Sequence, residues 1–480
     1  MKKQAYFVEL LVFLLLMMIM LSGIYNIVRY KNVGSGGGMD NFYNTDVPID
    51  VIIYGSSHAA CTVNNGILWE DYGIASYTLS AGGQGIDATY YFLQESIAVN
   101  KPKVALVETY LLTENKFSLA SYYRSALTSK FSSRFLSYTW DVIMANSIDR
   151  ETAEDMFFRM PIVHSRYKEL DKGDFVNGAE YIRGYRGDSA WTSVPKPEKT
   201  IRFGEISEDA LSYIDKMIAL CQKENVELVF FNAPYEISEE NYAKQNTLCK
   251  YVQERGCHYI SFNQDAEKYN IDFDRDFREG GHLNDLGAEK VTRALGDYIK
   301  KSCFVENRHG EDGYELWDQH VEYLKDRELR YMLNDCGTMD EYLSCLYDNI
   351  GDKTAVFSFN GNYRALGDEI YQPYLENLGI SQEAYERGGV WVIRDGKTLL
   401  CTDGESAFTS YQQLGKLTDL NVFKEETDEF VSILLNDTDL SPDCNGLSVL
   451  VFDENLEYPI HAMKVNVYDG TDVIDIELPE

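Results

Sequence analysis

The sequence predicts an α/β protein. We expect an N-terminal transmembrane helix, a doubly wound parallel sheet with helices on both faces and a helical insertion, and a smaller, β-rich α+β domain. An uncharged apolar run opens the chain, short apolar runs then alternate with helical stretches, and strands with few helices close it. The expected order is a transmembrane signal-anchor over 5–29, a flexible linker over 30–48, the α/β domain over 49–303 with its insertion over 111–205, a helical connector over 304–345, and the α+β domain over 346–480.

The apolar run from Leu10 to Val28 contains no charged residue. Its length is close to the ~20 residues that a helix needs to cross a bilayer. A cleaved signal peptide is the alternative, but its apolar region spans only ~7–15 residues and ends at a site of small residues. This run is longer and no such site follows, so we expect an uncleaved single-pass anchor with the bulk of the chain outside the cytoplasm.

Strands and helices alternate through the α/β domain. Short apolar runs bounded by Gly or Pro predict buried strands, and a strand–helix alternation predicts a parallel sheet. The expected strands lie at 49–54, 76–79, 104–107, 226–231 and 258–262, with helices ending near 99, beginning near 207 and covering 286–300. In the last domain we expect strands near 355–359, 390–393, 398–401, 429–434, 447–452 and 462–467, and a helix over 368–378.

The net charge of −33 argues against a nucleic-acid partner, because an acidic surface repels a phosphate backbone. Nine cysteines are present without any C-x-x-C pair, which gives no support for a thiolate zinc site. Their irregular spacing predicts mostly isolated thiols. We expect neither a cofactor nor a metal.

The first expected strand ends in Gly55-Ser56-Ser57-His58. In an open α/β sheet, ligands bind beyond the carboxyl ends of the strands. A serine at the head of the following helix can act as a nucleophile, and the N–H groups there can stabilise an oxyanion. The structural alternative is a serine that only caps the helix.

A serine nucleophile needs a general base and a carboxylate that orients it. His282 precedes the last helix of the domain, and the Gly280-Gly281 pair before it relaxes the backbone. Glu279 lies three residues upstream, within reach of the imidazole, and Asp276 is an alternative orienting acid. A histidine before a helix is otherwise more often a surface or cap residue.

The order of these elements resembles the SGNH (GDSL-like) hydrolases over residues 49–303. Gly55-Ser56-Ser57 resembles their first block, whose third residue is the nucleophile, and Glu279-Gly280-Gly281-His282 resembles their final D-x-x-H block with Glu in place of Asp. Gly83 falls where the second block places its oxyanion-hole glycine. The resemblance implies catalysis by Ser57, His282 and Glu279, with an oxyanion hole made by the N–H groups of Ser57 and Gly83.

The sequence His282-Leu283-Asn284, with Gly287, resembles a membrane-anchored branch that includes the alginate O-acetyltransferase accessory proteins and the D-alanyl lipoteichoic-acid transfer protein. That branch implies an O-acyltransferase that moves an acetyl or similar acyl group through a serine ester to a cell-envelope glycan or polyol. It also implies a membrane-bound O-acyltransferase partner that supplies the acyl group. The alternatives are a glycan O-acetyl esterase of the same fold and a non-catalytic glycan-binding scaffold.

One block departs from this pattern. The third block should supply an Asn after the third strand, but Glu108-Thr109-Tyr110 stands there, and Asn232 ends the fourth strand instead. Loss of one oxyanion donor typically costs ~10²–10³ in rate. We therefore expect a hole completed in another way, or a slow enzyme.

Two further segments carry weaker signals. In the insertion, His164 and Arg166 could bind a substrate carboxylate or sugar hydroxyls, but a solvated helix face is the favoured interpretation. The stretches 351–379, 388–393 and 445–452 faintly resemble the interleukin-like EMT inducer (PANDER-like) domain. That resemblance implies glycan binding, and a structural appendage is the alternative.

Overall fold

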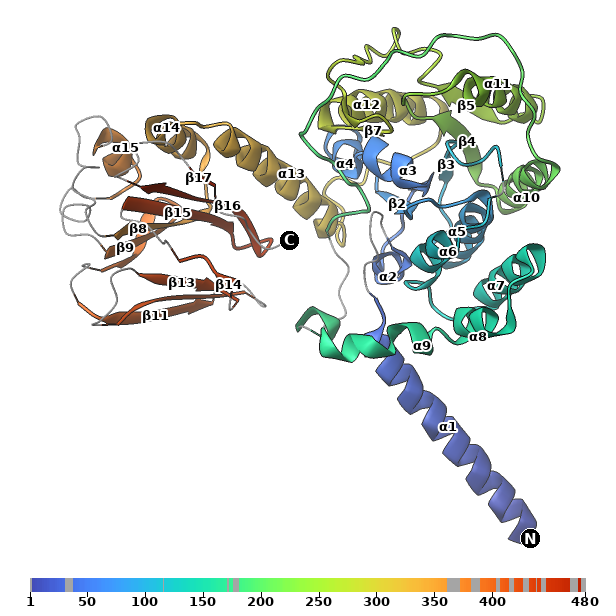
Figure 1. The fold of residues 1–480 in the computed structure, drawn as a ribbon, viewed down its shortest axis with the longest axis horizontal. Coiled ribbons are helices and arrows are strands. Elements are labelled where there is room, and N and C mark those ends of the chain that lie inside the picture. Colours follow the sequence, from blue (N-terminus) through green and yellow to red (C-terminus); the bar gives the residue numbers. More distant parts are fainter. Residues whose placement is uncertain are drawn as a thin grey trace. The chain divides into compact units, whose positions relative to one another are not determined.

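The computed structural model describes residues 2–30, 38–114, 116–170, 172–175, 181–360, 372–380, 389–402, 406–413, 418–425, 431–436, 438–441, 446–466 and 474–475. The chain forms two compact units, Met1–Val321 and Glu322–Glu480 (Figure 1). Each unit is described by itself.

The chain begins with a long apolar helix, α1 (Lys2–Val28). Its segment Val8–Val28 has the length and composition to cross a membrane, and almost none of it is buried. A signal sequence near an N-terminus has the same features, so this helix fits either an anchor or a signal peptide.

The first unit is built on a five-stranded sheet with the order β2-β1-β3-β4-β5, in which every neighbouring pair is parallel. Parallel pairing places the carboxyl ends of all five strands along one edge. The strands are β1 (Val51–Gly55), β2 (Ser76–Ser80), β3 (Val104–Glu108), β4 (Glu227–Asn232) and β5 (His258–Ser261). All five were expected at these positions, with ends that differ by one or two residues.

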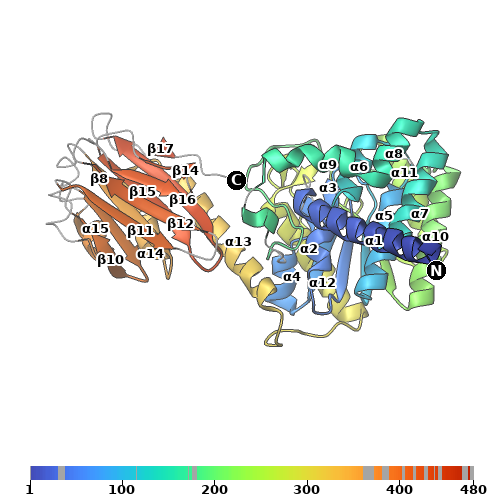
Figure 2. The ribbon, with the colours of Figure 1, turned by 90° about the horizontal axis from the view of Figure 1, so that it is seen from below.

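Helices cover both faces of this sheet, as a doubly wound fold requires (Figures 1 and 2). Ile52 and Tyr54 of β1 belong to one apolar core, and the alternate residues Val51 and Ile53 belong to the other. The first core is shared with α5 (Ile86–Val99), α10 (Glu208–Glu224) and α11 (Glu239–Gln253), and the second with α4 (Asn65–Tyr72) and α12 (Asp285–Ser302). The predicted fold class is confirmed.

The described helices of the insertion all lie between residues 119 and 175. Its elements are α6 (Leu119–Ala126), α7 (Ser133–Asn146), α8 (Arg150–Phe158), α9 (Met160–Val163) and the 3₁₀ turns η1 (His164–Lys168) and η2 (Lys172–Phe175). Residues 181–206 contain no helix. α6 reaches the carboxyl edge of the sheet, where Arg124 donates to the Gly82 carbonyl at 3.1 Å, whereas α7 packs on α5 through the stacked rings of Tyr91 and Tyr138. The insertion therefore covers the edge only in part.

The expectation of a flexible linker over 30–48 is wrong for residues 39–43. They form helix α2 (Met39–Tyr43), in which Met39 and Phe42 are fully buried. The Met39 N–H donates to Thr128 at 3.2 Å, and Asp40 forms a buried ion pair with Arg29. The remaining Gly-rich part, residues 31–37, lies outside the described residues.

Arg166 holds the end of α1 against the insertion. Its guanidinium donates to the Arg29 carbonyl at 2.7 Å and to the Val28 carbonyl at 3.3 Å, and it pairs with both oxygens of Asp174 at 2.8 Å. The expectation of a solvated helix face is therefore wrong for Arg166, since the backbone carbonyls of the α1 terminus capture its donors. His164 is exposed, as expected.

The second unit consists of two antiparallel sheets and a layer of helices. A six-stranded sheet has the order β10-β9-β8-β15-β16-β17, and a four-stranded sheet has the order β11-β12-β13-β14. The six strands are β8 (Thr354–Asn360), β9 (Gly389–Arg394), β10 (Lys397–Cys401), β15 (Gly446–Asp453), β16 (Tyr458–Asn466) and β17 (Ile474–Asp475). The four are β11 (Phe408–Gln413), β12 (Asp419–Lys424), β13 (Ser432–Leu435) and β14 (Thr438–Asp439).

Apolar residues of both sheets form one core between them, and a second core lies between the larger sheet and the helices. The helices are α13 (Glu315–Asn334), which crosses the boundary of the two units, α14 (Met339–Asn349) and α15 (Gln372–Asn377). The expected helix over 368–378 is described only from residue 372, and β11 and β12 were not expected. The predicted β-rich character is confirmed.

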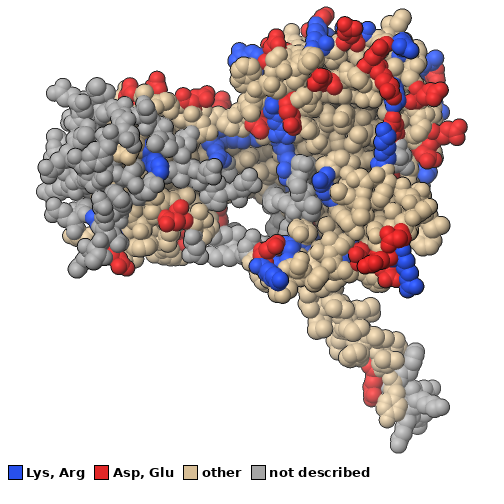
Figure 3. Space-filling model, viewed as in Figure 1, with Lys and Arg blue, Asp and Glu red and all other residues tan. Residues whose placement is uncertain are grey.

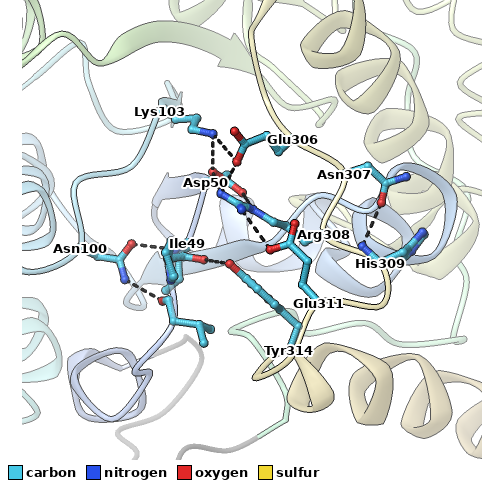
Figure 4. Close-up of polar contacts among 12 residues, drawn as sticks. Ile49, Asp50, Asn100, Lys103, Glu306, Asn307, Arg308, His309, Glu311 and Tyr314 are labelled. Atoms are coloured by element: carbon cyan, nitrogen blue, oxygen red, sulfur yellow. Dashed lines mark hydrogen bonds and ion pairs between the residues drawn. The ribbon is translucent and has the colours of Figure 1, made fainter.

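A cluster of charges fixes the amino end of β1 (Figure 4). Asp50 is almost fully buried directly before β1, and the Arg308 guanidinium donates to its two oxygens at 2.8 and 3.2 Å. Lys103 adds a contact of 3.2 Å, and the Tyr314 hydroxyl donates to the Pro48 carbonyl at 3.0 Å. The segment after α12 thus clasps the strand that leads to the site described below.

Substitution Arg308→Gln should lower the free energy of unfolding by about 2–4 kcal/mol, because it leaves a buried carboxylate with one partner fewer. Urea denaturation measures this loss. The double variant Asp50→Asn/Arg308→Gln should recover part of it, and Arg150→Gln, which changes an exposed arginine, should cost almost nothing. A loss for Arg308→Gln no larger than that of Arg150→Gln contradicts the interpretation.

Candidate active site

The turn at the end of β1 allows no side chain at Gly55. Its φ of +154° is unfavourable for other residues, and a Cβ there would lie 2.9 Å from the Ala59 Cβ and 3.0 Å from the Glu108 Cβ. β1 can therefore run directly into α3 (Ser57–Thr62). The N-cap is Ser56, whose hydroxyl accepts from the His58 N–H at 3.3 Å. Ser57 is left as the first residue of the helix, with its hydroxyl not needed for capping.

His282 stands on a short hairpin that the sequence analysis did not expect. Strands β6 (Phe277–Glu279) and β7 (His282–Leu283) pair around Gly280 and Gly281. The Thr192 N–H donates to the Phe277 carbonyl at 2.6 Å and joins the second half of the insertion to this hairpin. Asn284 then caps α12 by accepting from the Gly287 N–H at 3.1 Å.

The structure brings Ser57, His282 and Glu279 into one hydrogen-bonded series. His282 Nε2 lies 2.8 Å from Ser57 Oγ, and His282 Nδ1 lies 2.5 Å from Glu279 Oε1. A carboxylate can only accept, so Nδ1 carries the proton and Nε2 is left to accept from the serine hydroxyl. This is the arrangement in which an imidazole can take a proton from a hydroxyl while the acid fixes its tautomer.

Asp276, the alternative orienting acid, does not face His282. It is buried, its two carboxylate oxygens lie 2.8 and 2.7 Å from Lys290 Nζ, and it accepts from the Asp272 N–H at 2.7 Å. It ties α12 to the loop before the hairpin. Of the two acids, Glu279 is the one that contacts the imidazole.

The guanidinium of Arg278 lies close to the carboxylate of Glu279. Its Nε lies 3.9 Å from Glu279 Oε1, and its Nη2 donates to Cys61 Sγ of α3 at 3.1 Å. Asp188, from the second half of the insertion, lies 3.5 Å from Nη1. The hairpin, α3 and the insertion therefore converge on the arginine next to the acid.

Gly83 lies at the same sheet edge as Ser57. β2 pairs with β1 in a register that sets Ser80 beside Gly55, and Gly83 follows three residues later. Its φ of +72° suits glycine, and a Cβ there would lie 2.6 Å from the hydroxyl of Ser121 on α6. Its role as an oxyanion donor stays a prediction.

A cavity of about 160 Å³ opens beside this glycine. It is lined by Gly83, Gly85, Tyr110, Leu111, Thr113, Glu114, Lys116 and Asn241. Glu114 and Lys116 also border a larger, mixed-charge cavity of about 710 Å³ that includes Arg202 and Phe203. The smaller cavity touches the candidate oxyanion glycine, but neither cavity is lined by Ser57, His282 or Glu279.

Glu108 stands where the resemblance calls for an asparagine, and it turns toward backbone instead of the open site. Both of its oxygens accept from the Tyr110 N–H at 3.0 Å, and one accepts from the Ala233 N–H at 3.4 Å. The side chain is fully buried, which raises the pKa of its carboxyl to about 8 against the opposing effect of these N–H groups. Glu108 fastens the ends of β3 and β4 together.

Asn232 does not replace the missing donor either. It ends β4, and β3 separates that strand from β1. Its side chain is buried, its amide oxygen accepts from Asn263 Nδ2 at 2.7 Å, and its amide nitrogen finds no hydrogen-bond partner among the described residues. Neither Glu108 nor Asn232 forms a hydrogen bond with Ser57 or His282 among the contacts of the described residues.

The sequence analysis missed the place of His58 beside the site. Its ring stacks on Tyr110 with centroids 3.7 Å apart, and its centroid lies 4.9 Å from that of His282. Burial, and to a lesser extent the neighbouring His282, lowers the pKa of His58 well below its ordinary value. His58 is thus a neutral aromatic side chain packed next to the imidazole of His282. The only sequence signal was its position directly after the serines.

Neither a scan against protein-family models nor a search of curated proteins finds a match for this chain. Among solved structures, a proposed acylhydrolase from Bacteroides fragilis is similar, with 10% identity and a TM-score of 0.28 over 55% of this chain and 94% of the other. An acetyl xylan esterase, AlAXEase, gives 12% identity and 0.26 over 53% and 100%, and the acetyl xylan esterase Est2A from Butyrivibrio proteoclasticus gives 9% and 0.22 over 52% and 63%. Scores of this size identify neither a family nor an activity.

Replacing Glu108 by Gln should flatten the pH dependence of stability. The folded carboxyl titrates near pH 8, whereas in the unfolded chain it titrates near its ordinary value of 4.5. The folded state therefore binds the extra proton between these values, and the wild-type free energy of unfolding should fall as pH rises from about 5 to 8. Glutamine mimics the neutral acid, so the difference between wild type and Glu108→Gln should shift in favour of the variant over that window. Urea denaturation across this pH range measures it, and a difference independent of pH contradicts it.

Substitution Glu279→Ala should lower kcat/KM for a small ester by roughly 10–10³-fold, because the imidazole loses the group that fixes its tautomer. Glu279 is 60% exposed, so water replaces part of its effect and the loss should stay below that of a buried acid. The matched control is Asp276→Asn, which should lower thermal stability and leave the rate of the folded protein nearly unchanged. The reverse pattern would make Asp276 the functional acid.

Proposed function

We propose that this chain is an SGNH-like serine acyltransferase that modifies a glycan or polyol of the cell envelope from a membrane anchor outside the cytoplasm. One observation carries the proposal: Ser57 forms a continuous hydrogen-bonded series at the carboxyl edge of the sheet with His282 and Glu279, which are remote from it in the sequence. The resemblance of the surrounding blocks and the apolar helix α1 support the choice of class and place.

In the first half-reaction, His282 Nε2 takes the proton of Ser57 as Oγ attacks the carbonyl carbon of an acyl donor. Glu279 accepts the hydrogen bond from the Nδ1–H group throughout and stabilises the imidazolium. The N–H groups of Ser57 and Gly83 receive the oxyanion, and His282 returns its proton to the leaving group as the acyl bond to the donor breaks.

In the second half-reaction, an acceptor hydroxyl enters. His282 removes its proton, the acceptor oxygen attacks the serine ester, and the proton then passes from His282 to Ser57 Oγ as the acyl group leaves the enzyme. A sugar hydroxyl as acceptor gives transfer, and water gives hydrolysis. The cavity beside Gly83 offers space for a hydroxylated acceptor.

The second candidate is a glycan O-acetyl esterase that uses the same residues. The exposure of Glu279 favours it, because water can reach the acid and imidazole end of the series. Purified full-length chain with an acetylated glycan and no acceptor discriminates the two. Release of acetate supports the esterase, and acylated product that forms only with an added sugar or polyol supports the transferase, for which a membrane-bound O-acyltransferase would supply the acyl group.

A fluorophosphonate probe should label the wild-type chain, and Ser57→Ala should abolish both the labelling and ester turnover, with a loss in kcat on the order of 10⁴–10⁶-fold. Gel fluorescence and acetate release measure the two effects. The matched control is Ser56→Ala. It removes the cap of α3 at a cost of about 1 kcal/mol in stability and should keep the labelling. A wild-type chain that stays unlabelled would instead favour a non-catalytic scaffold.

A further inference from the structure

Helix α7 exposes an apolar stripe to its surroundings. Leu136, Trp140 and Met144 recur every fourth residue, so they lie on one face of the helix, and they are 45, 55 and 62% exposed. The opposite face is already buried against α5, through residues that include Phe135, Tyr138 and Val142. Among the exposed residues of α7, Asp141 is the only charged one. Among the described residues, α7 thus buries one apolar face and leaves a second apolar row largely exposed, with Ser137 and Asp141 beside it.

The residues just before α7 contact the end of α1. Phe131, two residues before α7 and itself 53% exposed, has its ring centroid 5.8 Å from that of Tyr25 in the last turn of α1. The Arg159 guanidinium lies over the rings of Phe131 and Phe135, at 4.2 and 3.8 Å from their centroids.

The same guanidinium is buried and donates to the carbonyls of Ala126 and Ser129 at 2.6 Å. α7 is thus held in a fixed position next to the end of α1.

This position sets the depth of α7 relative to a bilayer. Tyrosines near the ends of membrane helices lie at the headgroup level, and Tyr25 is three residues from the end of α1. Phe131 contacts that tyrosine and so lies at a similar depth. Figure 1 shows α9 beside the C-terminal end of α1, with α8 and then α7 following on the same side of the unit. In Figure 3 the surface of α1 is mostly uncharged, and charged side chains gather on both sides of its junction with the unit.

We propose that the exposed face of α7 rests in the headgroup region of the bilayer that α1 crosses, with Leu136, Trp140 and Met144 in contact with lipid. Interfacial helices bind membranes through such an apolar face, and tryptophan favours this depth. The inference rests on the membrane anchorage in the proposed function, and it is independent of the chemistry at Ser57.

The test uses the full-length chain reconstituted in phosphatidylcholine vesicles, with acyl chains either plain or brominated near the headgroup. Bromine quenches tryptophan emission only at contact distance. Brominated lipid should quench part of the wild-type emission, and Trp140→Phe should remove most of that quenching. The matched control is Trp191→Phe, since Trp191 is similarly exposed, at 64%, but lies in the second half of the insertion. It should leave the quenching unchanged.

Carbonate extraction of the same vesicles separates the two ways of failing. If the chain resists extraction but Trp140→Phe and wild type are quenched equally, α7 does not touch lipid and the inference is overturned. The stripe would then be free to bind another protein instead. If carbonate releases the chain, α1 is not an anchor, and the inference fails together with the membrane part of the proposed function. Fluorophosphonate labelling of Trp140→Phe should equal that of wild type in either case.

Discussion

The close approach at Gly55 is the constraint on which the site depends. A side chain there would strike Ala59 of the following helix and Glu108 of the neighbouring strand, so only glycine lets β1 end directly in α3. That junction puts Ser56 at the cap and Ser57 one residue further, where its hydroxyl meets an imidazole from the other end of the domain. Because the clasp of Arg308 on Asp50 fixes the opposite end of the same strand, both ends of β1 are held by contacts remote in sequence.

Glu108 stands at the position where the resemblance described above calls for an asparagine, and it has a structural role there. Glu108 uses its carboxyl to bind backbone N–H groups at the ends of two strands, and burial keeps it largely protonated near neutral pH. A buried charge there would be costly, so the raised pKa is the expected response. Glu108 thus does not supply the amide donor that an asparagine would offer at this position, and the proposed mechanism uses the N–H groups of Ser57 and Gly83 as donors.

Local patterns in the sequence predict the strands and the pairing of His282 with Glu279 well, because both depend on neighbours in the chain. Short apolar runs with Gly or Pro near at least one end mark the five parallel strands, and three residues separate the acid from the imidazole. The hairpin β6–β7 is too short to leave a pattern. Long-range contacts are invisible in the same way: nothing in the sequence says that His58 stacks on Tyr110, that Asp276 pairs with Lys290, or that residues 39–43 are buried.

The junction between α1 and the insertion has a mechanical consequence. Arg166 binds the last carbonyls of α1, and the Arg159 guanidinium lies over the ring of Phe131 next to the end of that helix. These contacts hold the α/β unit in a fixed orientation relative to α1. Figure 1 shows α3 and β7, which carry the serine and the imidazole, on the far side of the unit from α8 and α9. With α1 seated in a bilayer, the chemistry would take place at one set height above the lipid. Only those groups of a substrate that lie at this distance from the membrane could then reach Ser57.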